Sequence, residues 1–198
     1  MYRIISGKWK AKKIAAPKNF DVRPTTDFAK EALFSIIENK YDMQASSVLD
    51  LFAGIGSISF EFASRGCQDV TSVEMNPKHT SFLNSTASEL GFSSQVSVQR
   101  GDVYDWLKKF RNNKSYEIVF ADAPFETAEE KYNTMISLVL NNKYLKPNGI
   151  LIVEHQSRLS FDHPNFLYTR KYGNISFSFF QPNEEEPELE MASETEEN

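Results

Sequence analysis

The chain of 198 residues has a single cysteine, Cys67, and no cluster of metal-ligating residue types surrounds it. One cysteine excludes an internal disulfide, so Cys67 is interpreted as a small buried apolar residue in a reducing compartment. No apolar run is long enough to cross a bilayer, and the first residues lack the apolar stretch of a secretory signal. We therefore expect a cytoplasmic protein without a membrane segment or a metal site, and a monomer is the simplest expectation.

Positive charge is absent from the last residues and concentrated in the first. Residues 181–198 contain eight glutamates and no lysine or arginine, which predicts an acidic, disordered tail. The rest of the chain has 22 basic and 19 acidic residues, although the whole chain carries a net charge of -5. A basic arm on such a body suits a polyanionic partner, and a solvated strand that aids solubility explains it equally well. The first thirteen residues contain no acid and five basic residues, Arg3, Lys8, Lys10, Lys12 and Lys13.

Residues 21–180 alternate short apolar runs with helix-length amphipathic stretches. This alternation predicts an α/β fold, a mostly parallel seven-stranded sheet with helices on both faces. Two runs that flank Tyr172-Gly173-Asn174 predict a C-terminal antiparallel hairpin, and residues 1–20 predict a small N-terminal β-hairpin. The expected helices are 26–40, 58–64, 77–90, 104–110 and 129–140, and the expected strands are 48–52, 70–74, 95–99, 117–121, 149–154, 166–171 and 175–180.

A glycine turn follows the first of these strands, in Asp50-Leu51-Phe52-Ala53-Gly54-Ile55-Gly56. Gly54 and Gly56 permit close approach of the backbone to a ligand, because no Cβ intervenes. The third glycine of the dinucleotide fingerprint would fall at Ser59, which argues against a nicotinamide dehydrogenase. A carboxylate at Asp50 favours a cation, such as the ammonium or sulfonium of S-adenosylmethionine. An ordinary turn between strand and helix is the alternative interpretation.

Two further carboxylates stand at expected strand ends. Glu74 lies twenty residues after Gly54, a spacing at which an acid accepts hydrogen bonds from both ribose hydroxyls of a nucleoside. Asp102 follows the third strand, where open α/β sheets bind ligands, and can accept a hydrogen bond from the adenine amine. A solvated strand end is the alternative for Glu74, and a helix N-cap explains Asp102 equally well.

The segment Asp122-Ala123-Pro124-Phe125, at the end of the fourth strand, indicates the reaction. It resembles the D/N-P-P-Y/F motif of methyltransferases that act on amines conjugated to a ring. Such an amine is a poor nucleophile because its lone pair is delocalised, and acceptors from Asp122 and the carbonyl of residue 123 would localise that pair. Phe125 offers a flat face for the base. A strand-end turn with a core phenylalanine is the alternative.

Together these segments resemble the RsmD-type family of bacterial 16S ribosomal RNA guanine-N2 methyltransferases, over residues 2–180. The resemblance implies a Rossmann-like class I fold, S-adenosylmethionine as cofactor, and a guanine flipped out of ribosomal RNA or an assembling small subunit. Alanine at residue 123 departs from the usual proline, which reduces rigidity and adds a backbone N–H. The matching segments are RIISGKWK, RPTTDFAKEALFSII, LDLFAGIGSISFEFASRG, VEMN, DAPF, ILIVEH and KYGNISFSFF.

The motifs and the resemblance together give three sets of expected site residues. A surface histidine remains the alternative for residue 155, and a solvated strand for residues 170–171. The expected catalytic residues are Asp122, Ala123, Pro124 and Phe125. The expected cofactor residues are Thr25, Thr26, Asp50, Phe52, Ala53, Gly54, Gly56, Glu74, Met75, Asp102 and Val103. The expected RNA-binding residues are Arg3, Lys8, Lys10, Lys12, Arg23, His155, Arg170, Lys171 and Tyr172.

Two other functions fit parts of the sequence. An amino methyltransferase acting on DNA adenine or cytosine is compatible with Asp122-Ala123-Pro124-Phe125, although no separate domain is present to read a DNA sequence. A non-catalytic RNA-binding protein with a Rossmann-like body is the other alternative, and its main support is Ala123.

Overall fold

The computed structural model describes residues 1–17, 20, 25–109 and 114–182. Within them, expected helices and strands agree with the structure to within two residues at most ends. The helices are α1 (Asp27–Glu38), α2 (Ser59–Ser64), α3 (Pro77–Glu89), α4 (Val103–Lys109) and α5 (Glu129–Asn141). The strands are β1 (Tyr2–Arg3), β2 (Lys13–Ile14), β3 (Ser47–Leu51), β4 (Asp69–Glu74), β5 (Val96–Arg100), β6 (Tyr116–Asp122), β7 (Leu145–Gln156), β8 (Phe166–Tyr172) and β9 (Ile175–Phe180).

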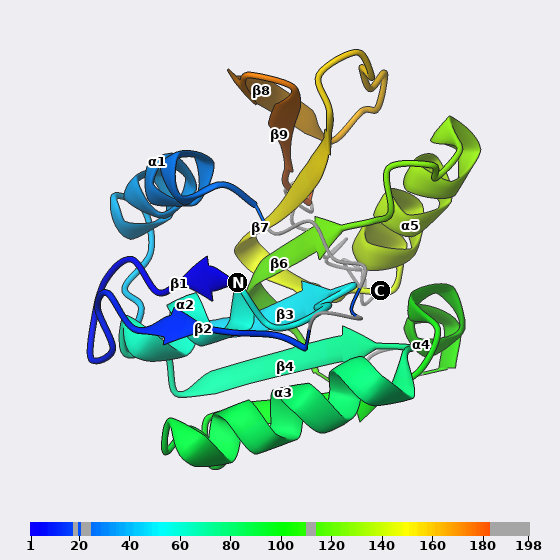
Figure 1. The fold of residues 1–198 in the computed structure, drawn as a ribbon. Helices are drawn as coiled ribbons and strands as arrows, with labels where there is room; N and C mark the ends of the chain where they lie inside the picture. The colour runs from blue at the N-terminus through cyan, green and yellow to red at the C-terminus, as the bar shows by residue number, and fades with distance from the viewer. Residues whose placement is uncertain (18–19, 21–24, 110–113, 183–198) are drawn as a thin grey trace, which may run out of the picture.

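Seven strands form one sheet in the order β5-β4-β3-β6-β7-β9-β8 (Figure 1). The first five are parallel, whereas β9 is antiparallel to both β7 and β8, so the predicted C-terminal hairpin is confirmed. The chain proceeds outward from β3 to β5 on one side and from β6 to β7 on the other, so the strand order reverses between β3 and β6. In open α/β sheets, ligands bind beyond the carboxyl ends of the strands at such a point.

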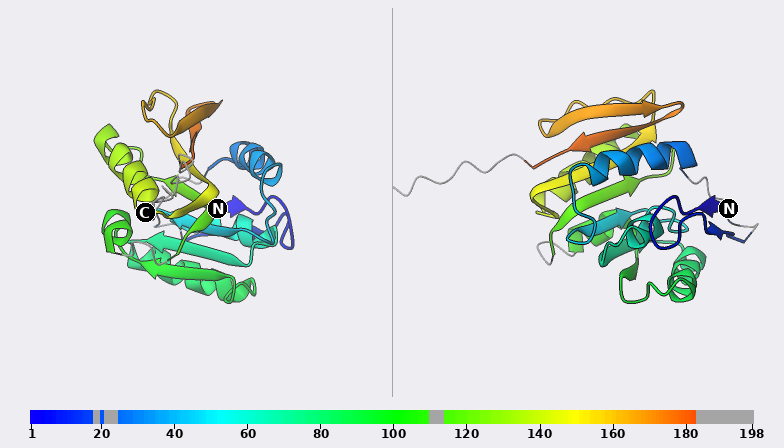
Figure 2. Two further views of the ribbon diagram at one scale, coloured as in Figure 1. Left: turned by 180° about the vertical axis from the view of Figure 1, so that it is seen from behind. Right: turned by 90° about the vertical axis from the view of Figure 1, so that its left-hand side faces the viewer.

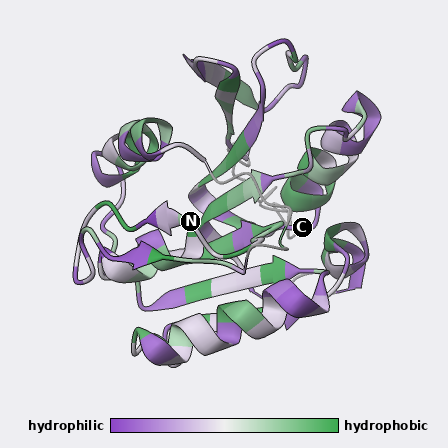
Figure 3. Ribbon diagram, viewed as in Figure 1, coloured by the Kyte–Doolittle hydropathy of each residue, from purple (hydrophilic) through white to green (hydrophobic). Residues whose placement is uncertain are grey.

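The central strands are buried on both faces, which explains their nearly continuous apolar sequences. Alternate residues of β6 enter different cores: Ile118 and Phe120 pack with α1, α2 and α3, whereas Val119 and Ala121 pack with α4 and α5. Figure 1 accordingly shows α1 and α5 on opposite sides of the sheet. In Figure 3 the central strands are mostly green, and the helices alternate green with purple. The two cores hold the strand ends in a fixed geometry.

Capping residues fix the starts of two helices near the carboxyl edge of the sheet. The Thr26 hydroxyl accepts a hydrogen bond from the Ala29 N–H, and the Asn76 side chain accepts one from the Lys78 N–H. Pro77 occupies the first turn of α3, where its missing N–H costs no helical hydrogen bond. The sequence-based assignment of both N-termini is thus confirmed.

The N-terminal strands form a separate two-stranded ribbon beside α2 (Figures 1 and 2). Tyr2, Ile4 and Ile14 are buried in the same core as α1 and α2, so this ribbon is packed on the body. Gly7 lies in the connecting loop at a φ of 80°, and a Cβ there would lie 1.8 Å from the Ser64 carbonyl oxygen. Only glycine therefore allows the loop to approach the end of α2 so closely.

Candidate active site

A cavity of about 620 Å³ opens at the carboxyl ends of β3, β4, β6 and β7. It lies at the point where the strand order reverses. Every expected catalytic residue lines it, as does every expected cofactor residue except Gly56. The lining residues are Thr25, Thr26, Asp50, Phe52, Ala53, Gly54, Ile55, Ser57, Ile58, Glu74, Met75, Asn76, His79, Gly101, Asp102, Val103, Phe120, Asp122, Ala123, Pro124, Phe125, Glu126, Glu154 and Ile175.

Glu74 is bound to the glycine turn. Its carboxylate accepts hydrogen bonds from the Gly54 N–H at 2.9 Å and from the Asn76 N–H at 2.7 Å. Its side chain is almost fully buried, so it is not a solvated strand end. Gly54 has a φ of 55°, and a Cβ built there meets only the Phe52 carbonyl oxygen within 4 Å, at 3.9 Å. The turn thus leaves open space beside Gly54, and its Gly54 N–H orients the Glu74 carboxylate.

Gly56 serves packing, in contrast to the expectation that it contacts the ligand. It has a φ of 82° and does not line the cavity. A Cβ at this position would lie 2.5 Å from Cδ2 of Leu83 and 2.6 Å from Cε2 of Phe60. The missing side chain therefore lets α2 and α3 pack against the turn.

Asp50 is the most deeply buried acid of the site, only 1% exposed. The Ser59 hydroxyl donates a hydrogen bond to its carboxylate, and Ser59 also lies 2.7 Å from the Ser72 hydroxyl. Burial raises the pKa of Asp50 to about 7, although the bond from Ser59 opposes the shift. A cation bound in the cavity would favour the charged form, so Asp50 is suited to a ligand with an ammonium or sulfonium group.

Asp102 caps a helix and also lines the cavity. One carboxylate oxygen accepts hydrogen bonds from the backbone N–H groups of Tyr104 and Asp105, which caps the start of α4. The same side chain lines the cavity. Val103 is buried beside it, whereas Met75 is 64% exposed at the rim.

The four expected catalytic residues follow β6 directly. Asp122 is the last residue of that strand, and Ala123 behind it is only 1% exposed. Phe125 is half-buried against the core, and its carbonyl accepts a hydrogen bond from the Gln156 side chain at 3.0 Å. The cavity therefore has an acidic group and an aromatic ring at its β6 end.

The charged side chains that line the cavity indicate which class of cofactor it can bind. Among the described residues that line it, none is lysine or arginine, and His79 is the sole basic side chain. Such a surface repels the pyrophosphate of a dinucleotide and attracts a sulfonium and an ammonium. The residues present therefore fit S-adenosylmethionine. The six acids are Asp50, Glu74, Asp102, Asp122, Glu126 and Glu154.

Glu154 and Glu126 are the two cavity acids that were not among the expected site residues, and Glu154 is the buried one. It stands near the end of β7 opposite Asp122, and it is 3% exposed. The Thr25 hydroxyl donates a buried hydrogen bond to it at 2.7 Å. The rule that identified Glu74 and Asp122, an acid at the end of an apolar strand, applies equally to Ile150-Leu151-Ile152-Val153-Glu154 and would have found it.

Most residues of the basic N-terminal segment lie far from this cavity. Lys12 pairs with Glu89, the last residue of α3, at 3.1 Å, and the Lys8 N–H donates to the Ser64 carbonyl at the end of α2. Since α3 has 13 residues and begins at the cavity, the Lys12 ammonium lies roughly 20 Å from the cavity. Lys10 is exposed in the same loop, and Arg3 pairs with Asp27 closer to the cavity.

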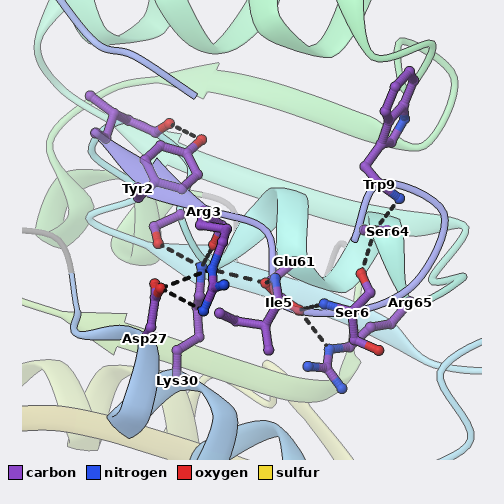
Figure 4. Close-up of polar contacts among 12 residues, drawn as sticks. Tyr2, Arg3, Ile5, Ser6, Trp9, Asp27, Lys30, Glu61, Ser64 and Arg65 are labelled. Carbon is purple, nitrogen blue, oxygen red and sulfur yellow. Dashed lines mark hydrogen bonds and ion pairs between the residues drawn. The ribbon is translucent and has the colours of Figure 1, made fainter. Parts of the chain in front are cut away.

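A buried acid, Glu61, attaches this segment to the body (Figure 4). Its carboxylate accepts hydrogen bonds from the backbone N–H groups of Ile5 and Ser6 and pairs with Arg65. Lys30 of α1 lies 3.4 Å from the same carboxylate and donates to the Arg3 carbonyl at 2.6 Å. The path of the N-terminal segment is therefore fixed by the body.

His155 does not reach the RNA-facing rim, in contrast to expectation. It is fully buried, its ring nitrogens lie 2.9 Å from the Gln156 carbonyl oxygen and 2.7 Å from the Ser178 hydroxyl, and burial lowers its pKa. Its ring contacts Phe161 on the sheet face opposite to Glu154. Side chains alternate along a strand, so adjacent residues of β7 cannot both face the cavity.

The other expected RNA-binding residues of the C-terminal region lie on β8, the outermost strand. Arg170 and Lys171 are exposed there. Tyr172 is half-buried, and its ring centroid lies 6.0 Å from that of Phe28, which is 71% exposed. Tyr172 pairs with Ile175, a residue of the cavity wall, so this strand end borders the site. Arg23 lies outside the described residues.

Comparison with known proteins places the chain in a family. The family model described as "Conserved hypothetical protein 95" matches residues 2–181. Ribosomal RNA small subunit methyltransferase D of Buchnera aphidicola subsp. Baizongia pistaciae is 36% identical over 158 residues, 80% of this chain and 78% of that protein. The Haemophilus influenzae protein of the same name is 33% identical over 185 residues, 90% of this chain and 93% of that one. The chain belongs to this ribosomal RNA small subunit methyltransferase D family.

Solved structures of other proteins have the same fold as this chain. A structure from Escherichia coli, 25% identical, has a TM-score of 0.78 and covers 91% of this chain and 97% of its own. An RNA methyltransferase from Salinibacter ruber, solved with S-adenosyl-L-homocysteine, is 16% identical, with a TM-score of 0.62 and coverage of 84% and 97%. The predicted RsmD-type family and Rossmann-like fold are confirmed. Within the described residues, no helix has the length and apolar character that a membrane span requires.

Proposed function

We propose that this protein transfers a methyl group from S-adenosylmethionine to the exocyclic N2 amine of a guanine in small-subunit ribosomal RNA. One observation carries the proposal: a single cavity at the reversal point of the sheet joins Glu74 and Asp102 to Asp122 and Phe125. Relatives that are 33% and 36% identical are named for methylation of small-subunit ribosomal RNA. The acceptors at one end of the cavity suit a nucleoside, and those at the other suit an amine.

The cofactor end of the cavity is the part formed by β3, β4 and the turn before α4. Glu74 is positioned to accept hydrogen bonds from ribose hydroxyls, since a carboxylate has more acceptor positions than the two backbone N–H groups occupy. Asp102 faces the cavity at the end of β5, where it can accept a bond from an adenine amine. Asp50 supplies the negative charge for a cationic methionine end. When bound, S-adenosylmethionine supplies an electrophilic methyl group on sulfur.

The β6 end activates the amine. Asp122 accepts a hydrogen bond from the amine, and the Ala123 carbonyl accepts a second, so the nitrogen lone pair is directed toward the methyl group. Bound S-adenosylmethionine would supply the methyl group for the new N–C bond, and the electron pair of the broken C–S bond would remain on its sulfur. Asp122 takes the proton that the alkylated nitrogen loses. Phe125 stacks on the base and holds it in line, which reduces the entropic part of the barrier.

The basic residues are spread over a wide surface, as expected for a protein that binds a large folded RNA. Arg170 and Lys171 are exposed on β8, and Tyr172 at the end of that strand borders the cavity, whereas Lys12 lies roughly 20 Å away at the far end of α3. A single flipped nucleotide does not span that distance, but a ribosomal particle does. We include these residues in the RNA-binding surface, and we propose that the protein acts as a monomer in the cytoplasm.

Methylation of small ribosomal subunits tests the proposal. Subunits purified from cells that lack the protein are incubated with methyl-labelled S-adenosylmethionine and the full chain, and the product nucleoside is mapped by mass spectrometry. We expect N2-methylguanosine at one position. Duplex DNA is assayed in parallel, and label in DNA adenine or cytosine but not in RNA would favour the DNA alternative. Cofactor binding without transfer to either substrate would favour the non-catalytic alternative.

A further inference from the structure

We propose that Glu154 binds the N1–H group of the target guanine and makes the pocket specific for guanine over other bases that carry an amine. The inference rests on the proposed function and adds a specificity-determining residue to it. Glu154 belongs to none of the motifs that indicated the reaction. It is the one acid of the cavity supplied by β7.

The position of Glu154 places it beside the amine-activating acid. Asp122 and Glu154 are register partners on the adjacent parallel strands β6 and β7, and both line the cavity. Register partners project to the same face of a sheet, and neighbouring strands lie about 4.8 Å apart. The preceding partners on that face, Phe120 and Ile152, belong to one core cluster, as the alternation requires. Two carboxyl groups therefore stand side by side at the base-binding end.

Thr25 orients the Glu154 side chain. Its hydroxyl donates a hydrogen bond of 2.7 Å to Oε2 of Glu154, and both side chains are buried. A carboxylate offers about four acceptor positions, so the bond from Thr25 does not prevent Glu154 from also accepting a hydrogen bond from a ligand. A buried polar contact of this kind restricts the rotamers of the acid. Glu154 therefore presents a fixed acceptor before the base enters.

Guanine has the edge that matches two adjacent acceptors. Its Watson–Crick edge carries the N2 amine and, next to it, the N1–H, which are both donors. Asp122 accepts from the amine and Glu154 from N1–H, so the pair reads two neighbouring donors. In adenine and cytosine the ring nitrogen beside the amine carries a lone pair and no hydrogen. That lone pair would face the Glu154 carboxylate, and an unmatched buried polar contact strongly disfavours the wrong substrate.

A base that lacks the N1–H tests this assignment. Small subunits are reconstituted with ribosomal RNA that has been ligated from two fragments. One fragment carries either guanosine or 2-aminopurine riboside at the mapped target position. Both bases have the N2 amine, but 2-aminopurine has a lone pair at N1 and a hydrogen in place of O6. The contribution of N1 is therefore read from the change in preference between the wild-type protein and the Glu154→Gln variant. We expect the wild-type protein to prefer guanosine by at least about 100-fold in kcat/KM, since discrimination by a buried hydrogen-bonding site is large.

The variant Glu154→Gln separates recognition from structure. Glutamine retains an oxygen for the Thr25 hydroxyl and adds an amide N–H₂, which can donate to the lone pair of 2-aminopurine. We expect the preference for guanosine to fall at least about tenfold, mostly through a loss on guanosine. S-adenosylhomocysteine affinity, measured by calorimetry, should stay within about twofold, because Glu154 is at the base end.

Thr25→Val is the matched control. It removes the hydroxyl that orients Glu154 but keeps the carboxylate, so both substrates should lose rate while their ratio changes less than about threefold. An unchanged preference in Glu154→Gln, with equal losses on both substrates, would show that Glu154 acts only through its contact with Thr25, and it would overturn the inference. Failure of the wild-type protein to methylate the guanosine particle would refute the proposed function itself.

Discussion

The Lys30 ammonium lies 3.4 Å from the Glu61 carboxylate, and both side chains are fully buried. Burial lowers the pKa of Lys30, whereas the negative charge of Glu61 opposes that shift. Lys30 also donates to the Arg3 carbonyl and to the Ser57 hydroxyl, a residue of the cavity wall. This pair therefore connects the N-terminal segment, α1 and the glycine turn.

Lys30→Met should destabilise the protein by about 1–3 kcal/mol, because it removes one of the two cations that pair with buried Glu61 and leaves the Arg3 carbonyl without its donor, while Arg65 still pairs with Glu61. The free energy of unfolding in urea measures this. Asp27→Asn breaks the half-exposed ion pair with Arg3 and serves as the control, with an expected change under about 1 kcal/mol. Equal small effects of the two substitutions would show that the buried pair contributes no more than a surface pair.

Cofactor affinity should depend on pH through Asp50. Its pKa in the folded protein is about 7, above the ordinary value of 3.8, so much of it is protonated at neutral pH. A cationic ligand favours the charged form, so the Kd for S-adenosylmethionine should tighten by up to about tenfold per pH unit as pH rises toward 7, and level off above it. Calorimetry at pH 5.5–8.5 measures this, and Asp50→Asn should give a weaker, flat profile.

The same titration has a consequence for stability in the absence of cofactor. Because the folded pKa of Asp50 is raised, its unfavourable contribution is absent below about pH 4 and grows until about pH 7, at about 1.4 kcal/mol per pKa unit. Asp50→Asn should therefore be more stable than the wild type at pH 8, and this advantage should vanish near pH 4. A stability difference that does not vary with pH would exclude a buried, titrating Asp50.

Alanine substitutions at two glycines with similar backbone conformations separate the cost of overpacking from the cost of backbone strain. Gly56 and Gly173 both have positive φ, but a Cβ at Gly56 would collide with Leu83 and Phe60, whereas a Cβ at Gly173 meets nothing within 4 Å. Gly173→Ala should cost about 1 kcal/mol from the backbone alone. Gly56→Ala should cost at least about 1 kcal/mol more, because of overpacking. Thermal unfolding measures both.

The fold and most of the cavity could be predicted because they depend on local pattern. Apolar runs predict the strands, and the rule that acids at strand ends bind ligands predicts Glu74, Asp102 and Asp122 as site residues. The sequence predicts that β7 starts at residue 149, four residues later than in the structure, because Lys146-Pro147-Asn148 is polar and resembles a turn. The burial of His155 depends on which face of β7 it occupies. The apolar run before it is buried on both faces, so it lacks the alternation of apolar and polar residues that would have indicated the face.

The roles of Gly56 and of the basic loop could not be predicted for another reason. The Cβ clash at Gly56 involves Leu83, and Lys12 pairs with Glu89, 77 residues away. Such contacts exist only after β3 and β4 have paired and α3 has packed. A local motif shows that a glycine is needed, but not whether ligand or protein occupies the space beside it.

RNA affinity should show the contribution of the basic loop through its salt dependence. Replacing Lys8 and Lys10 by glutamine removes up to two phosphate contacts, so the slope of log K against log salt concentration should fall by about 1–2. Binding of small subunits at several salt concentrations measures the slope. Lys40→Gln, at the end of α1, is the control and should leave it unchanged. An unaltered slope in the double variant would show that the loop does not contact phosphates.

The most direct test of the account is the kcat of Asp122→Ala on small subunits, measured together with its S-adenosylmethionine affinity. We expect kcat to fall by at least about 100-fold while the Kd for the cofactor stays within a few-fold, because Asp122 acts on the amine. A comparable loss of cofactor affinity would show that Asp122 maintains the structure of the cavity, and an unchanged kcat would show that it does not activate the amine.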